Sequence, residues 1–244
     1  MGVEQLAEAA TGLIEAGTRR VLLEKPGGLN TGEIRTVRQI AARHKADVMI
    51  AYNRRFYAST ILTRKLIAED GGAISCAFEF TEWGHTIVPL ALAPGVKEAW
   101  LLANSSHVVD LAIHLCGRPK DWRAWHGGSL SWHPSAARFC GAGITERGVF
   151  FSYHADWEAP GRWGLEVLTR KRRLIFRPME QLQVVPLGST SVNNVELDDA
   201  LDKEFKPGLF RQTKAFLDRD DHLFCTVDEQ LRHYEVYNEM AGYV

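Results

Sequence analysis

The spacing of hydrophobic residues divides the chain into two parts with different periods. Over residues 1–71, apolar positions recur every three or four residues in helical segments, and short uninterrupted apolar runs typical of fully buried strands separate them. The predicted elements are a helix over residues 3–17, a strand over 21–23, a helix over 31–45, a strand over 48–52 and a helix over 59–69. The connection between the two strands is a crossover, which favours parallel pairing.

After Gly72 the pattern changes to alternation, which predicts strands with one buried and one exposed face. The predicted strands cover residues 74–80, 149–157, 163–168, 173–176 and 182–185, with helices over 103–116, over 207–217 and after residue 226. The last helix begins with a capping box formed by Thr226 and Glu229, and another at Asn30 and Glu33 begins the second helix. These elements indicate a mostly antiparallel sheet with helices on one face and the other face open to solvent or a partner.

The composition is that of an ordinary globular protein and excludes some classes of function. There are 29 basic and 30 acidic residues, so no overall field favours nucleic acid or an anionic membrane. The four cysteines are far apart and form no CxxC pair, so we expect neither a zinc site nor a disulfide framework, and a reducing cytoplasm is the expected location. No basic start followed by a long apolar run occurs, so we expect no secretion signal and no membrane-spanning segment.

Polar residues that could carry chemistry follow both predicted parallel strands. The sequence Glu-Lys-Pro at residues 24–26 comes directly after the first strand, and Tyr-Asn-Arg-Arg-Phe at residues 52–56 ends the second. Ligands of open α/β sheets bind at the carboxyl edge of the strands, so the two groups are expected to lie close together. Taken alone, each group also fits a solvated strand end followed by a turn.

The predicted helix over residues 103–116 carries three titratable side chains on nearly one face. These are His107, Asp110 and His114, which are three and four residues apart. Two histidines and a carboxylate could bind a metal ion, but a single helix would supply all the ligands, and we therefore expect no metal site. The alternative is that His107 and Asp110 are polar residues at a domain junction and that His114 is a partly buried histidine.

Three short motifs occur together in one order: Glu-Lys-Pro at 24–26, Tyr-Asn-Arg-Arg-Phe at 52–56, and an HxxD pair at His107 and Asp110. With these motifs the chain resembles the Gfo/Idh/MocA family of NAD(P)-dependent oxidoreductases. The resemblance implies a fold of the α/β plus α+β class. Residues 1–71 would be a remnant of a Rossmann-type dinucleotide-binding domain with a parallel sheet. Residues 72–244 would be a mostly antiparallel open sheet with helices on one face, which binds substrate and forms oligomers.

The resemblance implies roles for residues of these motifs. Lys25 and His107 would be catalytic, the ammonium stabilising negative charge on the substrate oxygen and the imidazole transferring a proton near neutral pH. The cofactor-binding residues would be Glu24, Lys25, Pro26 and Asn53, and the substrate-binding residues would be Tyr52, Arg54 and Asp110. Family members often have a cis peptide bond before this proline, so we expect one at Lys25–Pro26. The implied reaction is hydride transfer between NAD or NADP and a hydroxyl of a sugar or nucleotide sugar.

The sequence departs from the family pattern in two places. Many members carry an aspartate four residues before the histidine of the HxxD pair, and this chain has Ala103 there. Lys25 and His107 could then suffice, Tyr52 could contribute, or the chemistry could differ. Asp110 is expected to do orienting or structural work rather than transfer a proton. The second departure is the dinucleotide-binding turn GxGxxG, which no part of the 244-residue sequence contains.

These departures leave two hypotheses open. The first is an oxidoreductase of this type in a truncated form that lacks the N-terminal part of the Rossmann domain, with NAD or NADP as cofactor. The second is a non-enzymatic sugar-binding, regulatory or assembly protein derived from the family. In the first case we expect a sugar or nucleotide-sugar substrate and a homodimer or homotetramer formed through the open sheet face, with no nucleic acid or membrane partner. The seven tryptophans include candidates for stacking on a sugar ring, although most are expected in the core.

Overall fold

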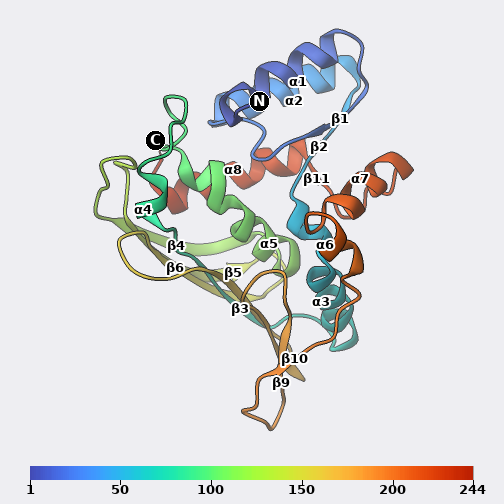
Figure 1. The fold of residues 1–244 in the computed structure, drawn as a ribbon, viewed down its shortest axis with the longest axis vertical. Coiled ribbons are helices and arrows are strands. Elements are labelled where there is room, and N and C mark those ends of the chain that lie inside the picture. The colour runs from blue at the N-terminus through green and yellow to red at the C-terminus, as the bar shows by residue number, and fades with distance from the viewer. Residues whose placement is uncertain (244) are drawn as a thin grey trace.

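A computed structural model describes residues 1–243, whose strands form one small and one large sheet (Figure 1). The small sheet has the order β1-β2-β11, where β1 is Arg20–Leu23, β2 is Asp47–Ile50 and β11 is Cys225–Thr226. β1 and β2 are parallel, with Val21 opposite Val48, as the crossover pattern predicts. β11 pairs antiparallel with β2 and comes from near the end of the chain, so local sequence patterns do not reveal it.

Helices α1 and α2 pack against the small sheet. The segments are η1 (Val3–Gln5), α1 (Leu6–Glu15) and α2 (Thr31–His44), the last of which connects β1 to β2. α1 and α2 lie side by side (Figure 1), and α2 buries the apolar stripe expected from the sequence. The side chain of Asn30 accepts a hydrogen bond from the backbone N–H of Glu33 at 2.9 Å, which confirms the predicted start of this helix.

The large sheet follows the order β10-β9-β8-β7-β3-β6-β5-β4. Its strands are β3 (Ser75–Phe80), β4 (Pro119–Gly127), β5 (Arg138–Thr145), β6 (Phe150–Asp156), β7 (Trp163–Leu168), β8 (Arg172–Phe176), β9 (Gln183–Pro186) and β10 (Asn193–Asn194). β3 and β6 are parallel and the other neighbouring pairs are antiparallel, which confirms a mostly antiparallel sheet. The five strands predicted for this part of the chain correspond to β3, β6, β7, β8 and β9.

The sequence patterns do not predict β4 and β5, and the structure gives the physical reason. β4 is an edge strand whose side chains are exposed or half-buried on both faces, so it has no clear alternation. β5 contains Gly141 and Gly143, which are typical of a turn in the sequence. In the sheet these glycines make room for neighbouring side chains, since a β-carbon at Gly141 would lie 2.5 Å from the ring of Tyr153.

Helices α5 (Ser106–Cys116) and α8 (Val227–Ala241) pack against one face of the large sheet (Figure 1). A π-helical turn, η3 (Leu101–Ser105), precedes α5, so the helix predicted over 103–116 begins earlier and changes geometry at its start. The side chain of Thr226 accepts a hydrogen bond from the backbone N–H of Glu229 at 3.2 Å, which confirms the predicted capping of α8. Because α8 also contacts α2 and β2, it joins the two sheets, and the division at residue 71 stays a prediction.

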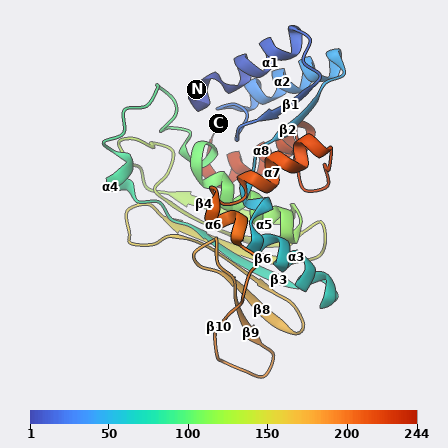
Figure 2. The same cartoon turned by 45° about the vertical axis from the view of Figure 1, so that its right-hand side comes forward.

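Four of the remaining helices follow or lie near the carboxyl end of β2 (Figure 1): η2 (Asn53–Phe56), α3 (Ala58–Glu69), α6 (Ala200–Glu204) and α7 (Leu209–Asp218). The short helix α4 (Gly84–Ile87) lies on the other side of the molecule (Figure 1), where Gly84 is close to Trp132 and Trp157. In both views α6 and α7 lie between the small sheet and α3 (Figure 1, Figure 2). Within residues 1–243, no helix is both long and apolar enough to cross a membrane.

Candidate functional site

Lys25 follows the end of β1 and is almost completely buried. Its exposed fraction is 6%, and its ammonium donates a hydrogen bond to the backbone carbonyl of Ala103. The Lys25–Pro26 peptide bond is cis, as expected from the sequence. The neighbouring Glu24 is exposed, because adjacent residues of an extended segment point to opposite sides. The strand end therefore places one charge in the interior and the other at the surface.

Side chains of α8 hold the backbone that follows Lys25. Gln230 donates from Nε2 to the carbonyl of Pro26 at 2.9 Å, and the hydroxyl of Tyr234 donates to the same carbonyl at 3.2 Å. The Tyr234 hydroxyl also donates to the carbonyl of Gly28. Both α8 side chains are buried, so the position of Lys25 depends on the last helix of the chain.

Tyr52 and Asn53 follow β2 and are buried in hydrogen-bonded positions. The Tyr52 hydroxyl accepts a hydrogen bond from Gln230 Nε2 at 3.0 Å and lies 3.2 Å from the hydroxyl of Tyr237. Burial raises the pKa of Tyr52 above its ordinary value, so the hydroxyl stays protonated and is a poor base. Asn53 donates from Nδ2 to the carbonyl of Pro207 at 3.0 Å, which ties this segment to the connection between α6 and α7.

His107, near the start of α5, lies between two aromatic rings. Its ring centroid is 6.0 Å from that of Tyr52 and 6.2 Å from that of Trp163. Burial lowers the pKa of His107 well below its ordinary value, and the positive charges of Lys25 and Arg54 lower it further. The imidazole is therefore neutral near pH 7. Its Nδ1 is buried and has no hydrogen-bond partner within residues 1–243, so it is free to bind a polar group.

The buried ammonium of Lys25 keeps hydrogen-bonding capacity for a ligand. Burial lowers the pKa of Lys25 to about 8; the charge of Glu24 opposes this shift and that of Arg54 adds to it. At pH 7 the ammonium form therefore still predominates. Among the described residues it donates only to the carbonyl of Ala103, whereas an ammonium has three donors. A substrate oxygen could take another donor and have its negative charge stabilised.

Glu82, which comes shortly after β3, adds a buried carboxylate to the surroundings of Lys25. Its Oε1 accepts a hydrogen bond from Ser105 Oγ at 2.7 Å and another from Asn104 Nδ2 at 2.9 Å. Desolvation raises the pKa of Glu82, and these two hydrogen bonds oppose that shift. Both donors come directly after Ala103, the position at which the resemblance leads one to expect an aspartate. A carboxylate thus reaches this region from a different element.

Arg55 and Asp110 form an ion pair in the interior. Arg55 donates from Nε and Nη2 to the two carboxylate oxygens of Asp110 at 2.9 and 2.6 Å, and Nη2 also lies 2.9 Å from Glu229 Oε1. Asp110 has no exposed surface. The guanidinium therefore connects η2 to α5 through Asp110 and to α8 through Glu229. This position suits the orienting role expected for Asp110, and its role in substrate binding stays a prediction.

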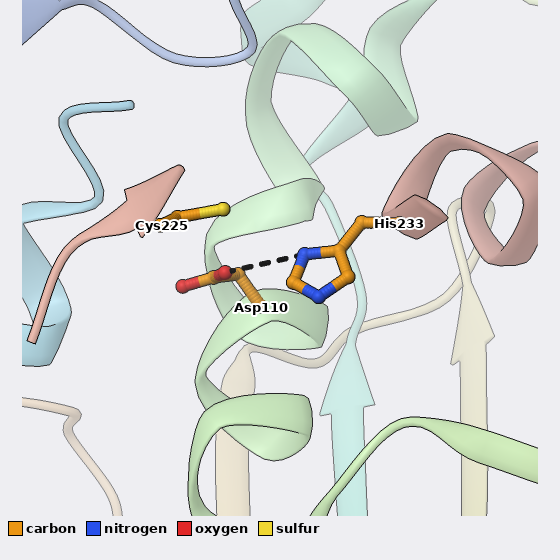
Figure 3. A group of neighbouring side chains, drawn as sticks. All are labelled: Asp110, Cys225 and His233. Carbon is orange, nitrogen blue, oxygen red and sulfur yellow. Dashed lines mark ion pairs between the residues drawn. The ribbon is translucent and has the colours of Figure 1, made fainter. Parts of the chain in front are cut away.

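Asp110, Cys225 and His233 gather around one point, as Figure 3 shows. Their potential ligand atoms lie within 4.8 Å of one another, and His233 Nδ1 is 3.7 Å from Asp110 Oδ1. A metal ion here would compete with the guanidinium of Arg55, which already binds both oxygens of Asp110. Burial also raises the pKa of Cys225 well above its ordinary value, which opposes the thiolate that a metal requires. We interpret this cluster as part of the buried ion-pair network.

The structure brings together some of the residues singled out from the sequence and separates others. Four of them lie around the carboxyl ends of β1 and β2, namely Lys25, Tyr52, Arg54 and His107. The rings of Tyr52 and His107 are in contact, and the charges of Lys25 and Arg54 are close enough to lower the pKa of His107. Glu24 is at the surface and Asp110 lies in the ion pair with Arg55. Pro26 and Asn53 are buried and take part in hydrogen bonds through a backbone carbonyl and a side-chain amide.

Sequence reasoning missed Glu82, Gln230 and Tyr234. Glu82 is a carboxylate in a short buried segment that follows β3. Charged residues are rarely buried, so a single carboxylate next to a predicted buried strand can point to a functional role. Gln230 and Tyr234 are four residues apart on one face of α8, together with other buried positions, but nothing local shows that this face meets the turn after β1. Their contacts join residues about 200 positions apart.

The fold is shared with solved structures of NAD-binding oxidoreductases. No family model matches the chain, and no curated protein matches it significantly. Levoglucosan dehydrogenase in complex with NADH and levoglucosan has a TM-score of 0.76 at 17% identity, covering 100% of this chain and 76% of that chain. UDP-N-acetylglucosamine 3-dehydrogenase from Acidithiobacillus ferrooxidans has a TM-score of 0.75 at 17% identity, with the same coverage. An NAD-binding oxidoreductase from Klebsiella pneumoniae has a TM-score of 0.73 at 15% identity, again over 100% and 76%. These similarities confirm the expected fold class.

The Arg55–Asp110 pair yields a test of stability. Replacing Asp110 with alanine should lower the free energy of unfolding by about 3–5 kcal/mol, because the buried guanidinium would lose its principal counterion. The double variant Arg55→Met/Asp110→Leu should recover much of this loss, since it removes both charges. Denaturant unfolding measures both values. A loss below about 1 kcal/mol for Asp110→Ala, typical of a solvated pair, would contradict the buried geometry.

The burial of Lys25 yields a second test. Lys25→Met should raise the free energy of unfolding at pH 7 by up to roughly 3 kcal/mol, because the folded state no longer desolvates an ammonium. The pKa of Lys25 is about 8 in the folded state and 10.5 ordinarily. Between pH 8 and pH 10.5, Lys25 binds more protons in the unfolded chain than in the folded chain. The free energy of unfolding of the wild type therefore rises with pH, and its difference from that of Lys25→Met becomes smaller.

Denaturant unfolding of the wild type and Lys25→Met at pH 7 and pH 10 measures this effect. Lys65→Met is a matched control, because the Lys65 side chain is 72% exposed and pairs only loosely with Glu69. It should change the free energy of unfolding by less than about 0.5 kcal/mol at either pH. If Lys25→Met lowers the free energy of unfolding, or if its effect is the same at both pH values, the ammonium is not desolvated as described.

Proposed function

We propose that this chain is an oxidoreductase of the Gfo/Idh/MocA type, which transfers hydride between NAD(P) and a hydroxyl group of a sugar or nucleotide sugar. The observation that carries the proposal is the pairing of a buried ammonium at Lys25 with a neutral imidazole at His107, both with unused hydrogen-bonding capacity. They lie at the carboxyl edge of a parallel strand pair, where α/β folds bind ligands. The sugar class is supported by the names of two proteins that share the fold, levoglucosan dehydrogenase and UDP-N-acetylglucosamine 3-dehydrogenase.

In the direction of oxidation, the chain's own residues would handle the hydroxyl group. The Lys25 ammonium would donate a hydrogen bond to the reacting oxygen and stabilise the negative charge that develops as its proton leaves. His107 would accept that proton on its free ring nitrogen, for which the neutral form is required. In the reverse direction the imidazolium would return the proton to the carbonyl oxygen. Tyr52 would orient the imidazole through its edge-on ring contact.

Glu82 would compensate for the alanine at position 103. It would fix Asn104 and Ser105 through their hydrogen bonds and place a carboxylate within electrostatic reach of Lys25. The carbonyl of Ala103 would position the ammonium directly. The proton-transfer step itself then needs only Lys25 and His107.

The residues after β1 and β2 fit the nicotinamide of a dinucleotide better than its pyrophosphate. Lys25 and Asn53 could border a nicotinamide ring, with Glu24 and Pro26 at its edge, and a bound nicotinamide would supply or accept the hydride. The turn after β1 does not fit a pyrophosphate. A β-carbon at Gly27 would lie 2.9 Å from Ile34 Cδ1 and 3.2 Å from Ile50 Cδ1, so the turn packs against the core. Backbone groups packed in this way do not form a phosphate cradle.

That packing also favours the second candidate function, a non-enzymatic sugar-binding, regulatory or assembly protein. Such a protein would bind a sugar beside Lys25 and His107 without a cofactor. For either function we propose association of copies through the outer face of the large sheet. Trp125 and Phe150 expose 58% and 62% of their surface in that sheet and would add apolar area to such an interface.

Cofactor titration distinguishes the two functions. The purified chain is titrated with NADH and with NADPH, and cofactor fluorescence reports binding. Saturable binding by the wild type is expected for the oxidoreductase, together with at least about tenfold weaker binding by Lys25→Met if this side chain contacts the nicotinamide. His154→Gln is the control, because His154 is an exposed histidine on β6 away from Lys25, and it should bind as the wild type does. No saturation by millimolar cofactor would overturn the oxidoreductase and leave the sugar-binding protein.

A further inference from the structure

Two arginines and two tryptophans form a continuous stack beside His107. The guanidinium carbon of Arg54 is 4.8 Å from the ring centroid of Trp163, and that of Arg162 is 5.3 Å from the same ring. Arg162 also lies 4.8 Å from the ring centroid of Trp83. Trp163 in turn contacts His107, with 6.2 Å between ring centroids. The stack therefore leads from the proposed reacting centre to the protein surface, where Arg162 is exposed.

Neither guanidinium has a protein counterion. Among the ion pairs formed within residues 1–243, none involves Arg54, Arg162, Lys25 or Lys206. The Nε of Arg54 is buried, and no hydrogen-bond acceptor in the described part of the chain lies opposite it. A buried donor without an acceptor is uncommon, since it forfeits its interaction with water. The arrangement is that of an anion site.

Several acidic groups face this stack, but none neutralises it. Glu82 and Glu180 lie within electrostatic reach of Arg54 without pairing with it. The Oε1 of Glu82 is occupied by hydrogen bonds from Ser105 and Asn104, and Glu180 is exposed. The charge of Arg162 lowers the pKa of Arg54, and burial lowers it more. Two like charges on one indole ring repel each other, and a bound anion would relieve that repulsion.

There is room for a ligand next to the stack. A cleft of about 690 Å³ is lined on one side by Glu82, Trp83 and Gly161, the residue that precedes Arg162. Trp132 and Trp157 form another part of its wall, with their rings stacked at 5.5 Å. Trp83 donates from Nε1 to the carbonyl of Gly161 at 2.7 Å, which holds the segment that carries Arg162 in place. A sugar ring in this cleft would lie against Trp83, whose ring also contacts the guanidinium of Arg162.

We propose that the ligand of this site is an anionic sugar, whose carboxylate or phosphate is bound by Arg54 and Arg162, the two arginines that lie against Trp163. Guanidinium groups suit this role because they donate two parallel hydrogen bonds to such anions. Lys206, in the exposed connection between α6 and α7, adds positive charge at the rim. The identity of this pocket as a substrate pocket rests on the proposed function, whereas the preference for an anion rests on the arginine stack.

Calorimetric titration with a matched pair of ligands tests the preference without any cofactor. D-glucuronate and D-glucuronamide have the same ring and differ in one charge, and D-glucose 6-phosphate is the phosphate probe. The wild type should bind at least one of the two anions about tenfold or more tightly than the neutral amide. Arg54→Gln and Arg162→Gln should each lose most of this preference. Arg43→Gln, which changes an exposed arginine on α2, should retain it.

Three results would overturn the proposal. They are equal binding of the anions and the amide, a preference that survives in both Arg54→Gln and Arg162→Gln, and no binding of either anion at tens of millimolar. Equal binding would leave a neutral-sugar oxidoreductase intact. Conversely, selective anion binding by a chain that fails to bind NADH or NADPH would support the anion site and refute the oxidoreductase. The outcomes for the two proposals are therefore separate.

Discussion

The buried ion pair of Arg55 and Asp110 fixes the geometry on which the candidate site depends. It joins the segment after β2 to α5, and its third member, Glu229, adds α8. Burying such a pair has a large desolvation cost, so a residue pair of this kind is better understood as setting geometry than as adding stability. Arg54 and His107 come from the same two motifs as the pair, and both contact Trp163. These two motifs therefore each supply one residue to the ion pair and one to the proposed site.

The difference between local patterns and contacts across the chain explains how far the sequence could predict the structure. Helical and alternating periods are local, and they gave the crossover unit, the caps at Asn30 and Thr226 and most strands of the large sheet. β11, Glu82 and Tyr234 were not predictable in this way, because their places depend on contacts between segments far apart in the chain. The resemblance pointed to Lys25 and His107. It could not show that the backbone carbonyl of Ala103 accepts from Lys25, or that the carboxylate of Glu82 binds the residue two positions later, Ser105.

Electrostatics gives the site its chemical character. Lys25 is charged although it is buried, and His107 is neutral because it is buried among cations. A donor that stabilises negative charge and an acceptor for a proton are what removal of a hydroxyl proton requires. The same positive surroundings, extended by Arg54 and Arg162 along Trp163, would attract a negatively charged ligand. The chemistry and the ligand preference would therefore have one physical origin, an excess of positive charge among partly buried side chains.

The central claim is that Lys25 is a desolvated ammonium at the reacting centre. An NMR titration of its side chain in the intact 244-residue protein tests this most directly, with the spectrum of Lys25→Met used to assign the signal. The account predicts a titration midpoint near pH 8 for this side chain. A midpoint near the ordinary value of 10.5 would mean that the ammonium is solvated, and it would contradict both its contact with Ala103 and its proposed role.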